Sequence, residues 1–273
     1  MHLLKGQPHG LNGSAEAVDL QQSPGDMVIL SAADTEISGL AAARRAIGEP
    51  FPSVRLANWM QLAHPYSVDL YSAAVLAKAR LVAIRLLGGP SYWRYGLDEA
   101  VRLARGSGTT LVVLPGDANW DASLAAEGTV GPEQAHRLWS YLVEGGSQNL
   151  ANALRYCAHL IGEAEEPMAA EALASAGRYE PSRAAPQPSL REGEREPVAA
   201  IVFYRALVQA GQTEPVDALC RAFRARGLAP LPLYVASLKS QQDAALVEAA
   251  FAEHAPAIVL NATAFALSPP GRE

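Results

Sequence analysis

Short runs of continuous apolar residues alternate, along the first half of the chain, with segments whose apolar residues recur at helical spacing. Four such runs predict strands, at 27–32, 54–58, 81–87 and 109–114. The three segments between them predict helices, at 35–47, 68–79 and 97–105. Strands that are apolar on both faces are typical of a parallel sheet covered by helices on each side.

Two further helices are predicted in succession, at 133–143 and 147–161, the second with a clean apolar face. Asp34, Ser147 and Ser237 each precede a predicted helix, and short side chains with an oxygen are preferred at that position. We expect each of the three to act as a helix N-cap.

The same alternation returns later in the chain, with predicted strands at 198–204, 231–235 and 257–261. Predicted helices at 215–226 and 243–254 separate them. A stretch rich in proline and charge divides this region from the first one, and such composition is typical of a linker.

We therefore predict an α/β protein with two Rossmann-like or flavodoxin-like parallel-sheet modules. The predicted parts are a flexible lead at 1–26, a first module at 27–162, a connector at 163–197 and a second module at 198–273. Three strands are few for such a module. The second module is therefore predicted to be incomplete, with the protein continuing beyond Glu273.

Composition narrows the function classes. The chain has 273 residues, 49% of them hydrophobic, and a formal charge of -6 without a basic run, which argues against nucleic-acid binding. Cys157 and Cys220 lack metal-ligand spacing and predict reduced thiols. No run approaches the roughly 18 apolar residues of a membrane span, and the start lacks the apolar core of a signal peptide. We expect a cytoplasmic protein.

The segment after the third predicted strand carries the densest candidate chemistry. Tyr92, Trp93, Arg94 and Tyr95 follow a Gly-Gly-Pro turn, and ligands of parallel sheets bind beyond the carboxyl ends of the strands. Aromatic rings and a guanidinium would suit a flat or anionic ligand. Alternatively, the aromatic residues close the end of the sheet and Arg94 lies in water; the residues leave both interpretations open.

Other candidates follow the remaining strands. Asp117 follows the fourth strand, and Arg205 and Lys239 follow strands of the second module, where either could bind a carboxylate. Asp117 could equally complete a turn, and each cation could be a surface charge. His64 precedes a helix and is a weak metal or ligand candidate, since a lone histidine is usually structural.

Common catalytic and nucleotide-binding signatures are missing from the sequence. It contains no GxGxxG, no GxxxxGK[ST], no HExxH, no CxxC and no GxSxG. A self-contained nucleotide site is therefore not expected, and no catalytic residue is assigned.

A set of motifs resembles one known family. In order they are MVILSAADTE, PSVRLANWMQLAHPYSVDLY, VAIRLLGGPSYWRYG, VVLPGD, LWSYLVEGGSQNLANAL and IVFYRALVQAGQTEPVDALCRAFRARGLAPLPLYVASLK. Together they are similar to the amino-terminal part of the large subunit of aerobic, ATP-dependent cobaltochelatase, which is related to the large subunit of magnesium chelatase. The resemblance runs from about Asp26 to about Phe265.

This resemblance implies a subunit that binds the corrin precursor hydrogenobyrinic acid a,c-diamide and inserts Co²⁺, the substrate metal. It also implies two smaller partner subunits, one of them an AAA+ ATPase that would hold ATP and Mg²⁺. The substrate-binding candidates are then Tyr92, Trp93 and Tyr95 for packing, Arg94, Arg205 and Lys239 for the substrate carboxylates, and Asp117. The family's large subunit is several times longer, so the chain is expected to be inactive alone.

Two other function classes remain open. The modules could form a two-lobed, non-enzymatic binding protein for a small anionic ligand. The alanine-rich helices could also serve a scaffold that only docks partner subunits.

Overall fold

The computed structural model describes residues 16–181 and 196–263. Contacts divide the chain into two compact units, Met1–Ala172 (unit 1) and Leu173–Glu273 (unit 2). The α/β class predicted from the apolar pattern is confirmed. Residues 1–15 of the predicted lead, 182–195 of the predicted connector and 264–273 of the predicted second module lie outside the described residues.

Unit 1 contains a fully parallel sheet, sheet A, with strand order β2-β1-β3-β4. Its strands are β1 (Met27–Ser31), β2 (Val54–Asn58), β3 (Leu81–Leu86) and β4 (Thr110–Pro115). Each lies within two residues of its predicted range at both ends. Continuous apolar strands form here because both faces of the sheet are covered, which a parallel sheet requires.

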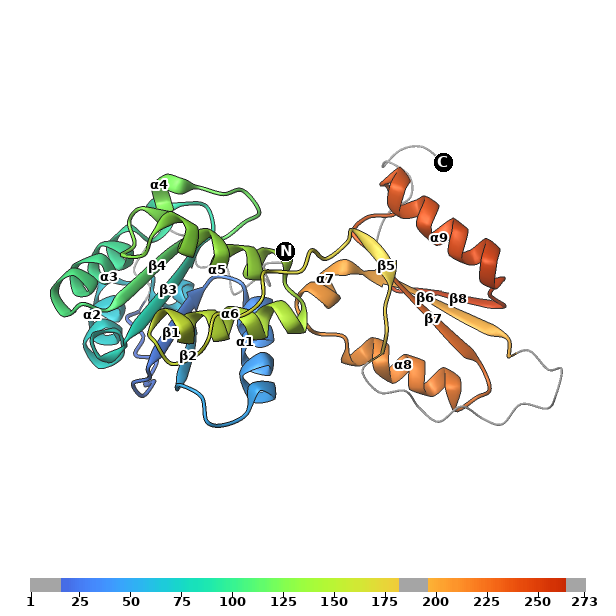
Figure 1. Ribbon diagram of the computed structural model, residues 1–273, viewed down its shortest axis with the longest axis horizontal. Coiled ribbons are helices and arrows are strands. Elements are labelled where there is room, and N and C mark those ends of the chain that lie inside the picture. Colours follow the sequence, from blue (N-terminus) through green and yellow to red (C-terminus); the bar gives the residue numbers. More distant parts are fainter. Residues whose placement is uncertain (1–15, 182–195, 264–273) are drawn as a thin grey trace. The chain divides into compact units, whose positions relative to one another are not determined.

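Helices cover sheet A on both faces (Figure 1). Val28 and Leu30 of β1 pack toward α2 and α3, whereas Met27 and Ile29 pack toward α1, α5 and α6. The helices of unit 1 are α1 (Asp34–Ile47), η1 (Trp59–Leu62), α2 (Pro65–Ala74), η2 (Leu76–Lys78), η3 (Pro90–Trp93), α3 (Arg94–Ser107), α4 (Ala122–Ala125), α5 (Pro132–Glu144) and α6 (Gly146–Leu160).

Unit 2 contains sheet B, with strand order β5-β7-β6-β8. Its strands are β5 (Ala176–Arg178), β6 (Val198–Tyr204), β7 (Ala229–Val235) and β8 (Ile258–Asn261), and its helices are α7 (Arg205–Gln209), α8 (Glu214–Arg224) and α9 (Gln241–His254). Strands β6, β7 and β8 are parallel, as predicted, but β5 is antiparallel to β7. The expectation of a purely parallel second sheet is therefore wrong.

Several local predictions are also wrong. Residue Ala33 occupies the N-cap position of α1, and Asp34 is already the first helical residue. Helix α6 begins at Gly146 without a side-chain cap from Ser147. The N-cap of α9 is Ser240 rather than Ser237, because the Ser240 hydroxyl accepts the backbone N–H of Asp243.

The described part of the predicted flexible lead is held against unit 1. The backbone N–H of Val18 donates to the Ser67 hydroxyl at 2.7 Å. Gln22 donates from its side chain to the Leu56 carbonyl at 3.1 Å and accepts the Tyr71 hydroxyl at 2.6 Å. Residues 16–26 are thus tied to β2 and α2 by side-chain bonds that hydropathy does not reveal.

Candidate functional site

The carboxyl ends of the four sheet A strands lie at one edge, because the strands are parallel and in register. In β1 and β3 the register places Ser31 beside Arg85, and Ser31 also lies beside Asn58 of β2. The turns that follow these four strands therefore begin at the same edge of sheet A.

Trp93 belongs to the core of unit 1. Its side chain is 5% exposed, its ring stacks on Trp59 with centroids 5.8 Å apart, and its indole N–H donates to the Leu62 carbonyl at 2.9 Å. The ring is therefore not available to a ligand at the surface. Of the two interpretations given for this segment, Trp93 fits the one in which the aromatic residues close the end of the sheet.

The neighbours of Trp93 are exposed. Tyr92 is 58% exposed and Tyr95 is 47% exposed. The Tyr95 hydroxyl donates to Asp69 at 2.7 Å, which links α3 to α2. Arg94 is paired with Asp98 at 2.6 Å and with Glu127 at 3.5 Å, and the hydrogen bond to Asp98 is the main cause that raises its pKa.

A buried ion pair at this edge was missed by sequence reasoning. Arg85 in β3 is paired with Glu36 in α1, and the two residues are 6% and 8% exposed. Arg85 also donates from Nε to the Pro115 carbonyl at 3.2 Å. Burial lowers the pKa of Arg85 to about 10, and the nearby Asp117 charge opposes that shift. The sequence did contain a signal for this pair, because Arg85 is a lone charged residue within the apolar run 81–87.

Two further candidates have local structural roles. The Asp117 carboxylate accepts the backbone N–H of Asn119 at 2.9 Å, as expected for a turn. His64 is the N-cap of α2, and its Nδ1 accepts the backbone N–H of Tyr66 at 3.1 Å. In residues 16–181 and 196–263, no cluster of three or more His, Cys, Asp or Glu side chains could hold a metal ion.

Arg205 and Lys239 lie in unit 2. Arg205 begins α7, and its guanidinium donates to the carbonyls of Ala174 at 3.0 Å and Leu173 at 2.9 Å. Lys239 is exposed in the loop between β7 and α9. Arg205 therefore helps to fix the start of unit 2, whereas the ammonium group of Lys239 is accessible to solvent.

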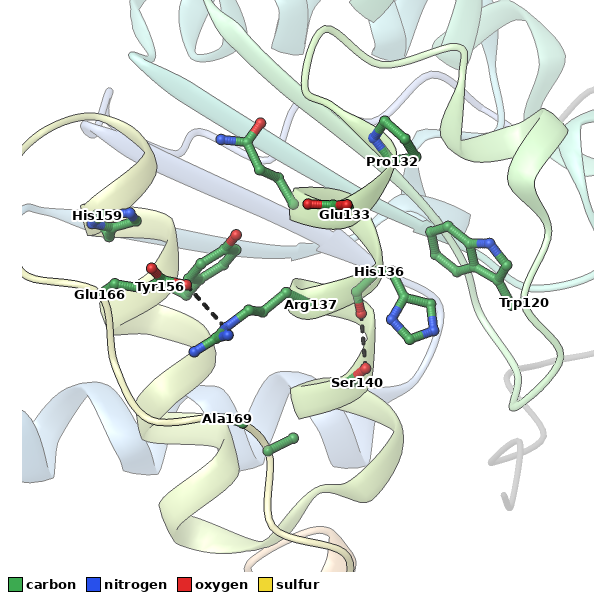
Figure 2. Close-up of a pocket in the computed structure, with 12 residues that line it drawn as sticks. Trp120, Pro132, Glu133, His136, Arg137, Ser140, Tyr156, His159, Glu166 and Ala169 are labelled. Carbon is green, nitrogen blue, oxygen red and sulfur yellow. Dashed lines mark hydrogen bonds and ion pairs between the residues drawn. The ribbon is translucent and has the colours of Figure 1, made fainter.

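Sequence reasoning also missed a pocket of about 760 Å³ in unit 1. Helices α5 and α6 and residues 164–170 form most of it. Its lining residues are Trp120, Pro132, Glu133, Gln134, His136, Arg137, Ser140, Tyr156, His159, Glu166, Ala169 and Ala170. Figure 2 shows Arg137 between two aromatic groups, with Trp120 and His136 on one side and Tyr156 and His159 on the other.

None of the helices in the described ranges combines the length and apolar character needed to cross a membrane.

Comparison with known proteins gives consistent matches. A family model described as CobN/Magnesium Chelatase matches residues 139–273. The aerobic cobaltochelatase subunit CobN of a Sinorhizobium species is 42% identical over 286 residues, which cover 100% of this chain and 22% of the relative. The subunit of the same name from Pseudomonas aeruginosa is 38% identical over 276 residues, covering 99% of this chain and 22% of the relative.

A solved structure agrees with these matches. The catalytic subunit of cobaltochelatase from Mycobacterium tuberculosis has 30% sequence identity and a TM-score of 0.64, over 81% of this chain and 17% of that one. The chain therefore spans only about a fifth of the length of the curated relatives it matches.

Proposed function

Because the chain belongs to the CobN/magnesium chelatase family, we propose that it forms part of the subunit of an aerobic cobaltochelatase that receives a corrin precursor for Co²⁺ insertion. The observation that carries the proposal is the 42% identity to a cobaltochelatase subunit over all of this chain. The proposed substrate is hydrogenobyrinic acid a,c-diamide.

The exposed residues after β3 support a role in substrate binding. Tyr92 and Tyr95 offer flat apolar surfaces, and aromatic rings pack well against extended π systems. Arg94 is held by two carboxylates of its own unit, and exposed ion pairs of this kind contribute little to stability. A substrate carboxylate can therefore exchange with Asp98 or Glu127 at small cost. In unit 2, the accessible Lys239 is the corresponding cation.

We propose that the other chemical steps take place outside this chain. Insertion of Co²⁺ forms metal–nitrogen bonds and releases the inner protons of the macrocycle to a base. We assign that base to no residue of this chain and expect the chain alone to be inactive. ATP hydrolysis with Mg²⁺ is proposed for an AAA+ partner subunit, with a second small subunit in the same cytoplasmic complex.

A binding titration tests this proposal. Hydrogenobyrinic acid a,c-diamide is added to the purified chain, and tryptophan fluorescence is recorded. We expect saturable quenching that is weakened at least about fivefold by Arg94→Ala, a loss typical of a charge-assisted hydrogen bond. Arg105→Ala is the matched control, because Arg105 is exposed at the other end of the same helix.

Three results would count against the proposal. Equal weakening by the two variants would remove Arg94 from the site. If the chain binds no corrin but still captures the partner subunits, the result would instead support a scaffold that only docks those subunits. A small anion that raises the melting temperature, without corrin binding, would support the two-lobed binding protein.

A further inference from the structure

We propose that the pocket between α5, α6 and residues 164–170 binds a small organic monocarboxylate with a flat apolar body. This inference is independent of the proposed metal insertion, since it uses no residue of the edge at β3. Three features of the pocket support it: an unpaired phenol, a guanidinium that already holds a carboxylate, and aromatic walls.

The unpaired phenol is Tyr156. This residue is 3% exposed and lines the pocket, and its hydroxyl makes no hydrogen bond within the described parts of the chain. The buried side-chain atoms without a partner in those parts are Glu36 Oε1 and Ser72 Oγ, so the Tyr156 oxygen is open to the pocket. A tyrosine hydroxyl that is open to a pocket can donate a hydrogen bond to a ligand there. Burial, followed by the Glu166 charge, raises the pKa of Tyr156, so the hydroxyl keeps its proton and can donate it. A ligand group that accepts this proton therefore suits the position.

The guanidinium is that of Arg137, which lies 5.8 Å from the centre of the Tyr156 ring. Its Nε is 3.2 Å from a carboxylate oxygen of Glu166, and its Nη2 donates to the Pro167 carbonyl at 2.7 Å. The side chains of Arg137 and Glu166 are 34% and 49% exposed, and ion pairs with that exposure are weak. Glu166 thus marks a carboxylate position that a ligand can take over.

The walls suit a flat ligand. Trp120 and His136 meet edge to face with centroids 4.9 Å apart, and His159 stacks on Tyr156 at an interplanar angle of 28° (Figure 2). A volume of about 760 Å³ lies within the usual range for small-molecule sites. Aromatic walls with a few polar groups are the common composition of such sites.

The charges in the pocket favour a single negative charge. Arg137 is the only arginine or lysine among the lining residues, and Glu133 also lines the pocket. When a ligand carboxylate displaces Glu166, it pairs with Arg137 and accepts the Tyr156 hydroxyl. A doubly charged phosphate would bring a second negative charge into a pocket already lined by Glu133 and Glu166, at a cost that a monocarboxylate avoids.

Titration calorimetry on the full chain tests the site with two probes of equal shape, naphthalene carboxylate and neutral naphthalene carboxamide. We expect the carboxylate to bind and the carboxamide to bind at least about tenfold more weakly. Tyr156→Phe, which keeps the buried ring, should weaken carboxylate binding about three- to tenfold. Glu166→Gln removes the internal competitor and should strengthen it about two- to fivefold.

Glu165→Gln is the matched control, because it makes the same charge change at an exposed neighbour that does not line the pocket. Unchanged binding is expected for this variant. Equal affinity for both probes, or no effect of either Tyr156→Phe or Glu166→Gln, would overturn the proposal.

A competition experiment shows whether the bound carboxylate belongs to a tetrapyrrole side chain or to a small free acid. Coproporphyrin, a flat macrocycle with several carboxylates, is added to the chain loaded with naphthalene carboxylate. Displacement that is lost in Tyr156→Phe would assign the pocket to a tetrapyrrole side chain. Binding of naphthalene carboxylate undisturbed by coproporphyrin would assign it to a small free acid.

Discussion

The Arg85 guanidinium on β3 is paired with the Glu36 carboxylate on α1, and neither side chain is more than 8% exposed. The pair connects the centre of sheet A with the helix that follows its first strand. Glu36 has a second carboxylate oxygen, Oε1, that is buried without a hydrogen-bond partner in the described chain. The buried negative charge of Glu36 is therefore balanced by one cation, the guanidinium of Arg85.

Removal of Arg85 alone should therefore be costly. We expect Arg85→Met to lower the free energy of unfolding of unit 1 by about 3–5 kcal/mol, because Glu36 stays buried without its counter-charge. The double variant with Glu36→Leu should recover most of that loss. Tryptophan fluorescence during urea unfolding measures it, since all four tryptophans lie in unit 1. Equal losses in the single and double variants would contradict the role of the pair.

Gly96 is predicted to be required for the packing of Trp93. A Cβ atom at Gly96 would overlap the Trp93 ring, which is buried and cannot move aside. Gly96→Ala should lower the stability of unit 1 by about 1–3 kcal/mol. Gly106 lies in the same helix with nothing within 4 Å of such an atom, so Gly106→Ala should raise stability by about 0.5–1 kcal/mol. Urea unfolding compares the two, and effects of the same sign would contradict this prediction.

The pair formed by Asp26 and Ser53 should make unit 1 sensitive to acid. Hydrogen bonds from the Ser53 hydroxyl at 2.6 Å and its backbone N–H at 2.9 Å lower the pKa of Asp26 below its ordinary value of 3.8. A carboxylate with a lowered folded-state pKa stabilises fully above its unfolded-state pKa and loses that contribution as the pH falls through the folded-state pKa.

Ser53→Ala should therefore cost about 0.5–1 kcal/mol at pH 7, and this difference from the original protein should shrink below about pH 4. Urea unfolding at several pH values measures the difference. A difference that stays constant down to about pH 3 would show that the Asp26 carboxylate is not involved.

The two cysteines should report on the two units separately. Cys157 is fully buried in unit 1 and Cys220 is 2% exposed in unit 2. Burial raises the pKa of Cys157 to about 12 and, as the largest cause, that of Cys220 to about 11. Neither thiol should react with iodoacetamide in the folded protein, because the thiolate is the reactive form. Peptide mass spectrometry at increasing urea should show each cysteine reacting only when its own unit unfolds, and alkylation in native buffer would contradict this.

The strands of both parallel arrays could be predicted because each is a continuous apolar run, a pattern that burial on two faces enforces. Strand β5 could not be predicted, since Ala176, Gly177 and Arg178 have no such pattern and are held mainly by backbone pairing with β7. A short edge strand is determined by its neighbour rather than by its own side chains.

The candidate residues show a similar division. A cluster of aromatic residues predicts that some face a surface and some face the core, but only packing separates the exposed Tyr92 from the buried Trp93. Arg85 could have been found, because a lone arginine inside a buried strand requires a partner. The pocket could not have been found from the sequence. Tyr156 and Glu166 come close to Arg137 only in the folded chain, where α6 and the segment after it pack beside α5.

The strand order of sheet A also constrains how unit 1 can fold. Strand β1 is synthesised first but ends up between two strands made later, with Met27 paired to both Val54 and Leu81. During translation one side of this apolar strand therefore stays without its permanent neighbour until residues 81–86 have emerged. Such distant pairings are slow to close, so unit 1 should refold more slowly than a helical bundle of similar length.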